Sequence, residues 1–149
     1  METQLAQFEQ STVKDGIQAA TWCLNHNLIQ QGYTILQETL ITYFVSMIGE
    51  NPENFDNQNR NRTIANQAVT IFLKNKPEKK WFKEAAHNKD ITRKFQNLYK
   101  KNQNIVKIYR DLTGSRNDIN HCGFNDNPAR IKTLEDNLGK FINKVEKNI

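Results

Sequence analysis

Residues 29–48 read IQQGYTILQETLITYFVSMI, and this stretch decides the fold class. Apolar side chains recur along it at intervals of three and four residues, which is the period of an α-helix. One strip comprises Ile29, Tyr33, Leu36, Leu40, Phe44 and Met47, and a second comprises Ile35, Ile41, Val45 and Ile48. A helix that is apolar on two sides is usually central in a bundle or shared with a partner subunit. The stretch therefore predicts a helical bundle organised around this helix.

The same period predicts further helices before and after this stretch. We expect a first helix over residues 12–26, and we expect Gly49 to cap the helix that follows. A polar loop should then extend to about residue 61. Thr63 is expected to cap a shorter helix that ends before Pro77.

The second half of the chain continues the helical pattern. Asp90 is expected to cap a helix whose apolar stripe is interrupted at Asn102, and Gly114 is expected to end it. A short two-turn helix over residues 115–123 and a last helix opened by the Asn127-Pro128 pair complete the chain. No segment shows convincing strand alternation. The pattern predicts an all-α bundle of about five or six helices.

The composition narrows the class of protein further. The chain has 149 residues and a mass of 17.4 kDa, which fits one domain over residues 1–149. Six Gly and three Pro are too few for the many tight turns of sandwiches and barrels. Two Cys cannot form a disulfide framework, the opening METQLA is no signal segment, and the longest apolar stretch is far shorter than the ~20 residues of a membrane span. We therefore expect a soluble cytoplasmic protein with no membrane partner.

The formal net charge of +5 is concentrated in one part of the chain. Residues 74–110 hold 12 Lys and Arg against 3 Asp and Glu, whereas residues 1–73 hold 3 against 7 and residues 111–149 hold 6 of each. Basic residues interleaved with aromatic ones favour a polyphosphate ligand, through counterion release and base stacking. Alternatively, the lysines solvate helix faces and the aromatic side chains belong to the core. Both interpretations stay open.

Residues 115–124, SRNDINHCGF, carry the clearest chemical signal. In a helix, Asn117 and His121 stand four residues apart on one face, so the amide can orient the imidazole. Arg116 lies about 7.5 Å from His121 along the helix axis. Imidazoles can act as base and acid near neutral pH, and a guanidinium can stabilise a pentacovalent phosphorane. No carboxylate cluster for two metals accompanies these residues, so they indicate metal-independent RNA cleavage by the ribose 2′-OH.

Two stretches of the chain resemble one family. The motif Arg116-Asn117-x-x-x-His121, with its continuation Cys122-Gly123-Phe124, is similar to the R-x4-6-H signature of HEPN ribonucleases, in the form common in their CRISPR-associated branch. Independently, residues 22–38, WCLNHNLIQQGYTILQE, resemble the helix-turn-helix that opens the HEPN domain of type III CRISPR accessory ribonucleases. The two matches bracket residues 22–124, which is most of the chain.

The resemblance implies an α-helical homodimer with a composite active site between its two HEPN domains. Such enzymes cut single-stranded RNA without a metal or other cofactor and leave a 2′,3′-cyclic phosphate, as part of antiviral defence. Arg116, Asn117 and His121 would inherit the catalytic roles. Relatives usually carry an N-terminal CARF sensor domain that binds cyclic oligoadenylate. The present 149 residues have no room for one, so we expect the effector part or a stand-alone form.

Several other assignments stay open at the sequence level. Gln30, Gln31 and Tyr33 line the RNA groove on one interpretation and are ordinary helix residues on the other, and Lys107 and Arg110 are further candidate RNA-binding residues. A zinc site could in principle combine Cys23 and His26 with the His121-Cys122 pair, but nothing else has ligand spacing. The whole chain could instead be a non-catalytic, antitoxin-like dimerisation or RNA-binding module, or an unrelated helical scaffold.

Overall fold

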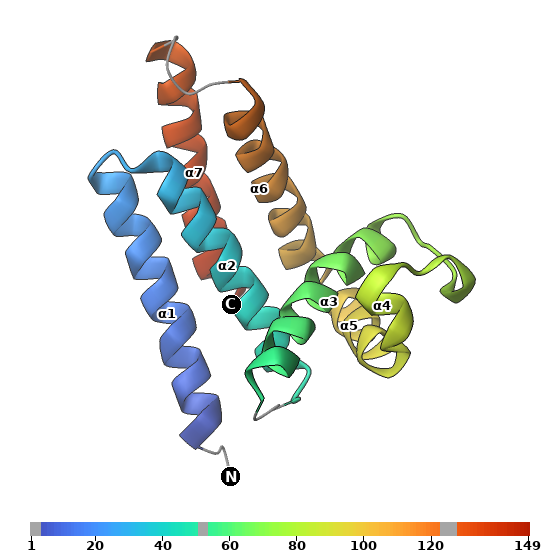
Figure 1. Ribbon diagram of the computed structural model, residues 1–149. Helices are drawn as coiled ribbons and strands as arrows, with labels where there is room; N and C mark the ends of the chain where they lie inside the picture. The colour runs from blue at the N-terminus through green and yellow to red at the C-terminus, as the bar shows by residue number, and fades with distance from the viewer. Residues whose placement is uncertain (1–3, 51–53, 123–127) are drawn as a thin grey trace. The chain divides into compact units, whose positions relative to one another are not determined.

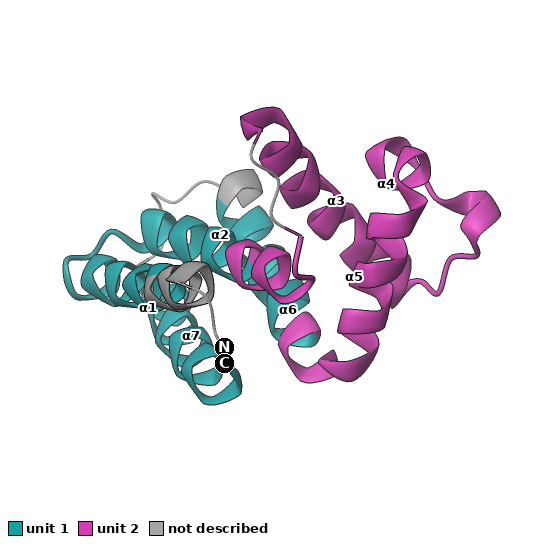
Figure 2. Cartoon of the chain, turned by 90° about the horizontal axis from the view of Figure 1, so that it is seen from below, with its two compact units in different colours: residues 1–40, 107–149 teal, residues 41–106 magenta. Residues whose placement is uncertain are grey.

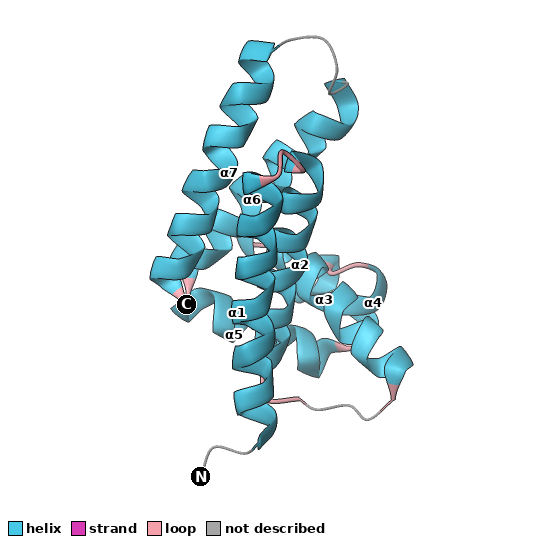
Figure 3. Ribbon diagram, turned by 90° about the vertical axis from the view of Figure 1, so that its left-hand side faces the viewer, coloured by secondary structure: helices cyan, strands magenta, loops and turns pink. Residues whose placement is uncertain are grey.

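The computed structural model of the chain describes residues 4–50, 54–122 and 128–149, without the side chains of the helical residues 4–11, 120–122 and 128–129. All regular structure within these ranges is helical, as Figure 3 shows, and this confirms the all-α prediction. No helix in the described ranges has the length and apolarity that a membrane span requires.

The described part of the chain holds seven α-helices and one short 3₁₀ helix, rather than five or six helices (Figure 1). In chain order they are α1 (Gln4–Asn25), α2 (Ile29–Met47), α3 (Phe55–Leu73), the 3₁₀ helix η1 (Glu78–Lys80), α4 (Lys83–His87), α5 (Lys89–Lys101), α6 (Gln103–Cys122) and α7 (Pro128–Asn148). Pro128 opens α7 as predicted, while Asn127 lies outside the described residues.

The chain divides into two compact units, which Figure 2 colours separately. Unit 1 comprises residues 1–40 and 107–149, and unit 2 comprises residues 41–106. Helices α2 and α6 each contribute one part to unit 1 and the other part to unit 2. The interpretation of the chain as one domain stays a prediction.

Close helix contacts hold unit 1 together. At Gly16 of α1, an added Cβ would lie 2.1 Å from Thr39 Oγ1 of α2, so only glycine permits this approach. Tyr33 of α2 is fully buried, and its hydroxyl donates a hydrogen bond to the Leu134 carbonyl of α7 at 2.8 Å. Burial raises the pKa of Tyr33 to about 12, which keeps the phenol neutral at physiological pH.

Unit 2 is built around Tyr99 of α5. The rings of Phe44, Phe72 and Phe95 surround Tyr99, with centroid separations of 5.0, 6.1 and 5.9 Å. The Tyr99 hydroxyl donates a hydrogen bond to the Ala65 carbonyl of α3 at 2.7 Å. Tyr99 is fully buried, so this bond satisfies a polar group that would otherwise be costly inside the core.

Asparagine and glycine residues end three of the helices. Asn27 after α1 and Asn75 after α3 both adopt a left-handed backbone, with φ of 60° and 50°. Each belongs to a Schellman motif, in which the next amide reaches back five residues: Leu28 N to Cys23 O at 2.8 Å, and Lys76 N to Ile71 O at 3.0 Å. Gly49, with φ of 73°, follows α2 where the sequence predicted its cap.

Two predicted helix starts were wrong. Helix α1 begins at Gln4 rather than near residue 12. Helix α3 begins at Phe55, eight residues before the expected cap Thr63, which lies inside the helix. The side chain of Asn54 caps α3 instead by accepting a hydrogen bond from the Asp56 amide at 2.7 Å. Residues 56–63 of α3, DNQNRNRT, are all polar and lack the apolar period, which conceals this start in the sequence.

The predicted ends around α5 and α6 also need correction. Asp90 is the second residue of α5, not its cap, and it pairs with Arg93 at 3.0 Å. The expected single helix does divide at Asn102. By contrast, α6 continues through Gly114, so the separate helix over residues 115–123 does not form, and Gly123 lies outside the described residues. The buried Leu112 and Ile119 stand seven residues apart on one face, and their packing outweighs the low helix propensity of glycine.

Alanine substitutions at two glycines should shift stability in opposite directions. Gly114→Ala should raise the free energy of unfolding by about 0.5–1 kcal/mol, because the residue is helical and its Cβ would meet open space. Gly16→Ala should lower it by about 1–3 kcal/mol, because Thr39 must move aside. Urea denaturation followed by circular dichroism measures both. A destabilising Gly114→Ala would contradict a continuous α6.

Candidate catalytic site on α6

A hydrogen-bonded chain of three side chains joins α6 to α2 within unit 1. Arg116 Nη1 of α6 donates to Gln37 Oε1 of α2 at 2.6 Å. Gln37 Nε2 in turn donates to the Tyr109 hydroxyl oxygen at 3.4 Å. Tyr109 and Arg116 stand seven residues apart on α6, so they share the helix face that meets Gln37. The amide of Gln37 therefore connects a cation with a phenol.

The inner end of this chain is closed to solvent. Gln37 is 9% exposed and Tyr109 is 2% exposed. Burial is the main reason why the pKa of Tyr109 lies above its ordinary value of 10, and the hydrogen bond with Gln37 acts in the opposite direction. The phenol is thus neutral at physiological pH, and Gln37 is held in one orientation by its two partners.

The outer end of this hydrogen-bonded series is Arg116, a cation for which the described residues supply no counterion. Arg116 is half-buried, and its described partner is the neutral amide of Gln37. Within the described residues, no carboxylate lies within ion-pair distance of Arg116. A guanidinium has five N–H donors in a planar fork, so most of its donors are left for an anion such as a phosphate.

The motif residues occupy adjacent faces of one continuous helix. Asn117 is exposed, and helical spacing puts Arg110, Asn117 and position 121 on one face, about 100° around the axis from Arg116. Gly114 lies on the same face between Arg110 and Asn117, and nothing stands within 4 Å of its hypothetical Cβ. The helix backbone is consequently bare there, and a ligand chain can approach it closely.

His121 lies in the last turn of α6, which ends at Cys122. This position agrees with the predicted location at a helix C-terminus, where the helix dipole favours cations. The side chain of His121 lies outside the described part of the structure, as does the side chain of Cys122. The structure therefore locates the His121 backbone on the same helix as Arg116 and Asn117.

The other predicted RNA-binding residues divide into three groups. Tyr33 is buried in the core, so the structure does not bear out its expected place in a groove. Gln30 and Gln31 are exposed on α2, and Gln30 shares the helix face of Gln37 two turns away. Lys107 and Arg110 are exposed on α6, but Lys107 stands on the face opposite Arg116, and Arg110 forms an ion pair with Asp111 at 3.0 Å.

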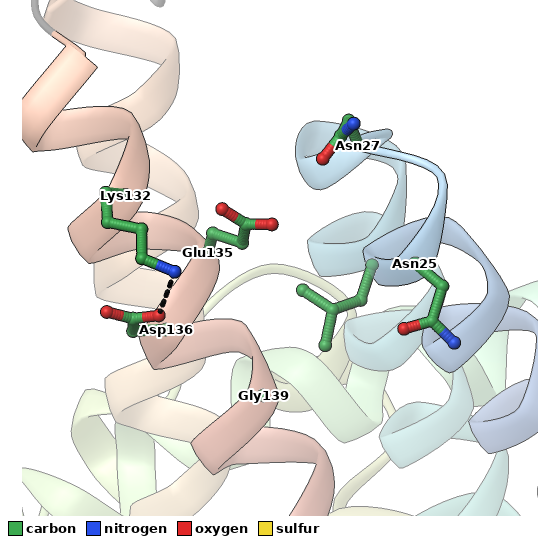
Figure 4. Close-up of a pocket in the computed structure, with 7 residues that line it drawn as sticks. Asn25, Asn27, Lys132, Glu135, Asp136 and Gly139 are labelled. Carbon is green, nitrogen blue, oxygen red and sulfur yellow. Dashed lines mark ion pairs between the residues drawn. The ribbon is translucent and has the colours of Figure 1, made fainter.

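A shallow pocket of unit 1 lies elsewhere, between the end of α1 and α7. Figure 4 shows Asn25 and Asn27 facing Lys132, Glu135 and Asp136 across it. Lys132 pairs with Asp136 at 3.2 Å, which leaves the charge of Glu135 uncompensated within the lining. A net negative lining disfavours phosphate, and none of the predicted catalytic residues lines this pocket.

The alternative zinc site gains no support from its described half. Cys23 is buried, whereas the exposed His26 stacks on Trp22 with ring centroids 4.0 Å apart. His26 Nδ1 also lies 2.8 Å from the Trp22 carbonyl, so it donates a hydrogen bond there. Among the side chains that the structure describes, no three His, Cys, Asp or Glu residues come together as metal ligands.

Comparison with known proteins finds no matching family model, no matching curated protein and no matching solved structure. The site therefore has to be interpreted from its own chemistry.

Gln37 is the functional-site residue that the sequence did not single out. It stands four residues after Tyr33, in a helix that is apolar on two sides. A polar residue at a position of the apolar period must find a buried partner, and that conflict is the signal that could have identified it.

Removal of the Gln37 amide should destabilise the protein through its two partners. Gln37→Ala should lower the free energy of unfolding by about 1–3 kcal/mol, because it removes the partner of Arg116 Nη1 and one hydrogen bond of the buried Tyr109 hydroxyl. Gln31→Ala, an exposed position on the same helix, is the matched control and should change it by less than about 0.5 kcal/mol. Equal values in urea denaturation would show that the Gln37 hydrogen bonds contribute nothing.

Proposed function

We propose that this protein is a metal-independent endoribonuclease of the HEPN type that cleaves single-stranded RNA at a composite site formed by a homodimer. The observation that carries the proposal is the setting of Arg116. This cation has no carboxylate partner in the described residues, and Gln37 of α2 holds it in place. It lies on α6, the helix that also bears Asn117 and His121. The resemblance of residues 22–38 supplies the family, and the proposed role in CRISPR-linked antiviral defence rests on that resemblance alone.

The chemistry requires a base, an acid and a positive charge at the phosphate. One His121 imidazole accepts the proton of the ribose 2′-OH as the 2′-oxygen forms its bond to phosphorus. The bond from phosphorus to the 5′-oxygen then breaks, and the second imidazole protonates that leaving oxygen. Arg116 stabilises the additional negative charge of the pentacovalent phosphorane. The products are a 2′,3′-cyclic phosphate and a 5′-hydroxyl, and no cofactor takes part.

Two subunits are needed because one chain has a single motif histidine. The second apolar strip of α2 supports a partner surface. Of its members, Ile35, Val45 and Ile48 are only half-buried within the single chain, whereas Ile41 is buried; Met47 of the first strip is 50% exposed. A twin subunit that covers this strip would remove apolar surface from water and bring a second His121 into the assembly.

The principal test is the substitution His121→Ala. It should abolish cleavage of an unstructured RNA oligonucleotide, because neither base nor acid remains, while circular dichroism stays unchanged. His87→Ala is the matched control, since His87 is an exposed histidine of α4, and it should cut like the wild type. Mass spectrometry should find a 2′,3′-cyclic phosphate end, and EDTA should leave the rate unchanged.

Cleavage that persists equally in the His121→Ala preparation would identify a contaminant and refute the proposal. Wild-type protein that binds RNA with a steep salt dependence but never cuts it would instead identify the antitoxin-like binding module.

The composite site makes the rate depend on dimerisation. The specific activity of the wild type should fall on dilution, in parallel with the fraction of dimer that analytical ultracentrifugation measures, because a lone protomer has half of a site. A specific activity that stays constant where the protein is monomeric would rule out a site shared between subunits.

A further inference from the structure

The segment from the end of α3 to the first residue of α4 is strongly basic. Residues 74–83, KNKPEKKWFK, are here called the basic loop, and they hold five lysines against one glutamate. Four of these lysines, Lys74, Lys79, Lys80 and Lys83, are exposed. Unit 2 as a whole contains 12 Lys and Arg and 6 Asp and Glu, a net charge of +6, whereas unit 1 contains 9 and 10, a net charge of −1.

The carboxylates near these lysines are already engaged by other side chains. Glu78 receives two hydrogen bonds from Arg93, with Nε to Oε1 at 2.6 Å and Nη2 to Oε2 at 3.1 Å. Glu84 accepts a hydrogen bond from Gln67 Nε2 at 2.5 Å. These bonds lower the pKa of both carboxyls, the one through Arg93 and the other through Gln67.

The charge of the basic loop is therefore compensated only in part: Arg93 balances Glu78, whereas Glu84, whose partner Gln67 is neutral, still attracts Lys83. Across the described parts of the chain, no carboxylate lies within ion-pair distance of Lys74, Lys79, Lys80 or Lys83. Close cations of one sign attract a polyanion strongly, because its binding releases condensed counterions.

The backbone of the basic loop is fixed by its own hydrogen bonds. The η1 turn is closed by Lys80 N to Pro77 O at 2.8 Å, and Trp81 Nε1 donates to the Lys76 carbonyl at 3.1 Å. Lys76 Nζ lies 5.0 Å from the centroid of the Phe82 ring. An ordered loop loses little conformational entropy when a ligand binds, so the lysines are held ready for contact.

These observations favour phosphates over bases as the groups that bind. The aromatic side chains of the basic loop, Trp81 and Phe82, are half-buried and already contact Lys76, which reduces the ring surface left for stacking. Lysine ammonium groups act as point charges that contact phosphate without reading sequence.

We infer that the basic loop is a phosphate-binding element that holds the backbone of single-stranded RNA, through Lys79, Lys80 and Lys83, independently of base identity. The choice of RNA as the polyanion rests on the proposed function. The element itself needs no catalytic residue, because its ligands are the exposed lysines of unit 2.

The test compares two triple variants of the full chain in a His121→Ala background, which prevents cleavage during binding. Lys79→Gln, Lys80→Gln and Lys83→Gln together remove three positive charges from the basic loop. Lys14→Gln, Lys140→Gln and Lys147→Gln together remove three exposed charges from unit 1 and serve as the control. The probe is a fluorescein-labelled unstructured RNA oligonucleotide, and fluorescence anisotropy gives its affinity over a range of salt concentrations.

The loop variant should bind the RNA at least about tenfold more weakly than the parent, and its plot of log affinity against log salt should be less steep by about 2, since each phosphate contact on a single strand contributes about 0.7. The control should retain most of the affinity. Circular dichroism should show the same helix content for both variants.

Three results would overturn the inference: a parent that does not bind the RNA, a loop variant that binds like the parent, or a control that loses as much affinity as the loop variant. The proposed function fails separately. If protein with His121 intact leaves RNA uncut while the loop variant loses affinity, the basic loop binds RNA in a protein that is not a ribonuclease.

Discussion

The burial of α2 is the constraint on which the rest of the structure depends. Leu36 and Leu40 of this helix are fully buried in unit 1, and Phe44 is fully buried in unit 2. A helix buried on several sides has few positions left where a polar side chain can reach water. Gln37 and Thr39 are polar and buried, so each must be satisfied inside the protein. Thr39 donates to the Ile35 carbonyl of its own helix at 2.7 Å, whereas Gln37 reaches across to α6.

The neutral character of Gln37 matters for the proposed function of Arg116. A carboxylate at position 37 would also satisfy the guanidinium, but it would cancel the positive charge that a phosphate requires. The amide oxygen of Gln37 accepts one hydrogen bond from the Arg116 guanidinium, which fixes the side chain and leaves its positive charge intact. The same amide donates to Tyr109, which burial keeps neutral, so the phenol itself adds no negative charge to the network.

How much the sequence predicts depends on how local the cause is. The helical period located α2 within one residue of its end, and the Schellman motif at Asn27 lies in the turn that ends α1. Helix α4 escaped prediction because five residues are too short to show a period. Gly114 misled the prediction because a local propensity was outweighed by the tertiary packing of Leu112 and Ile119.

The candidate site shows the same division between local and distant causes. The spacing of Arg116, Asn117 and His121 is visible in the sequence, and α6 carries all three. Gln37, the partner of Arg116, is 79 residues away along the chain, so no local pattern could pair the two. The sequence equally could not decide between a solvated and a ligand-binding role for the basic segment. That choice depends on which side chains bind Glu78 and Glu84, and these are Arg93 and Gln67.

The charges of the basic loop and of Arg116 follow one physical rule. In each case a cation is left without a carboxylate partner. Arg116 is held by the neutral amide of Gln37, and the lysines of the basic loop do not pair with Glu78 because Arg93 binds it. Arg93 suits this role because its planar fork bonds both oxygens of Glu78, which lysine cannot do. Arg93 thus compensates Glu78, so this carboxylate is not available to pair with the lysines. On the proposed function, binding and chemistry would draw on separate cations, so the affinity for a polyanion could change without altering the charge at Arg116.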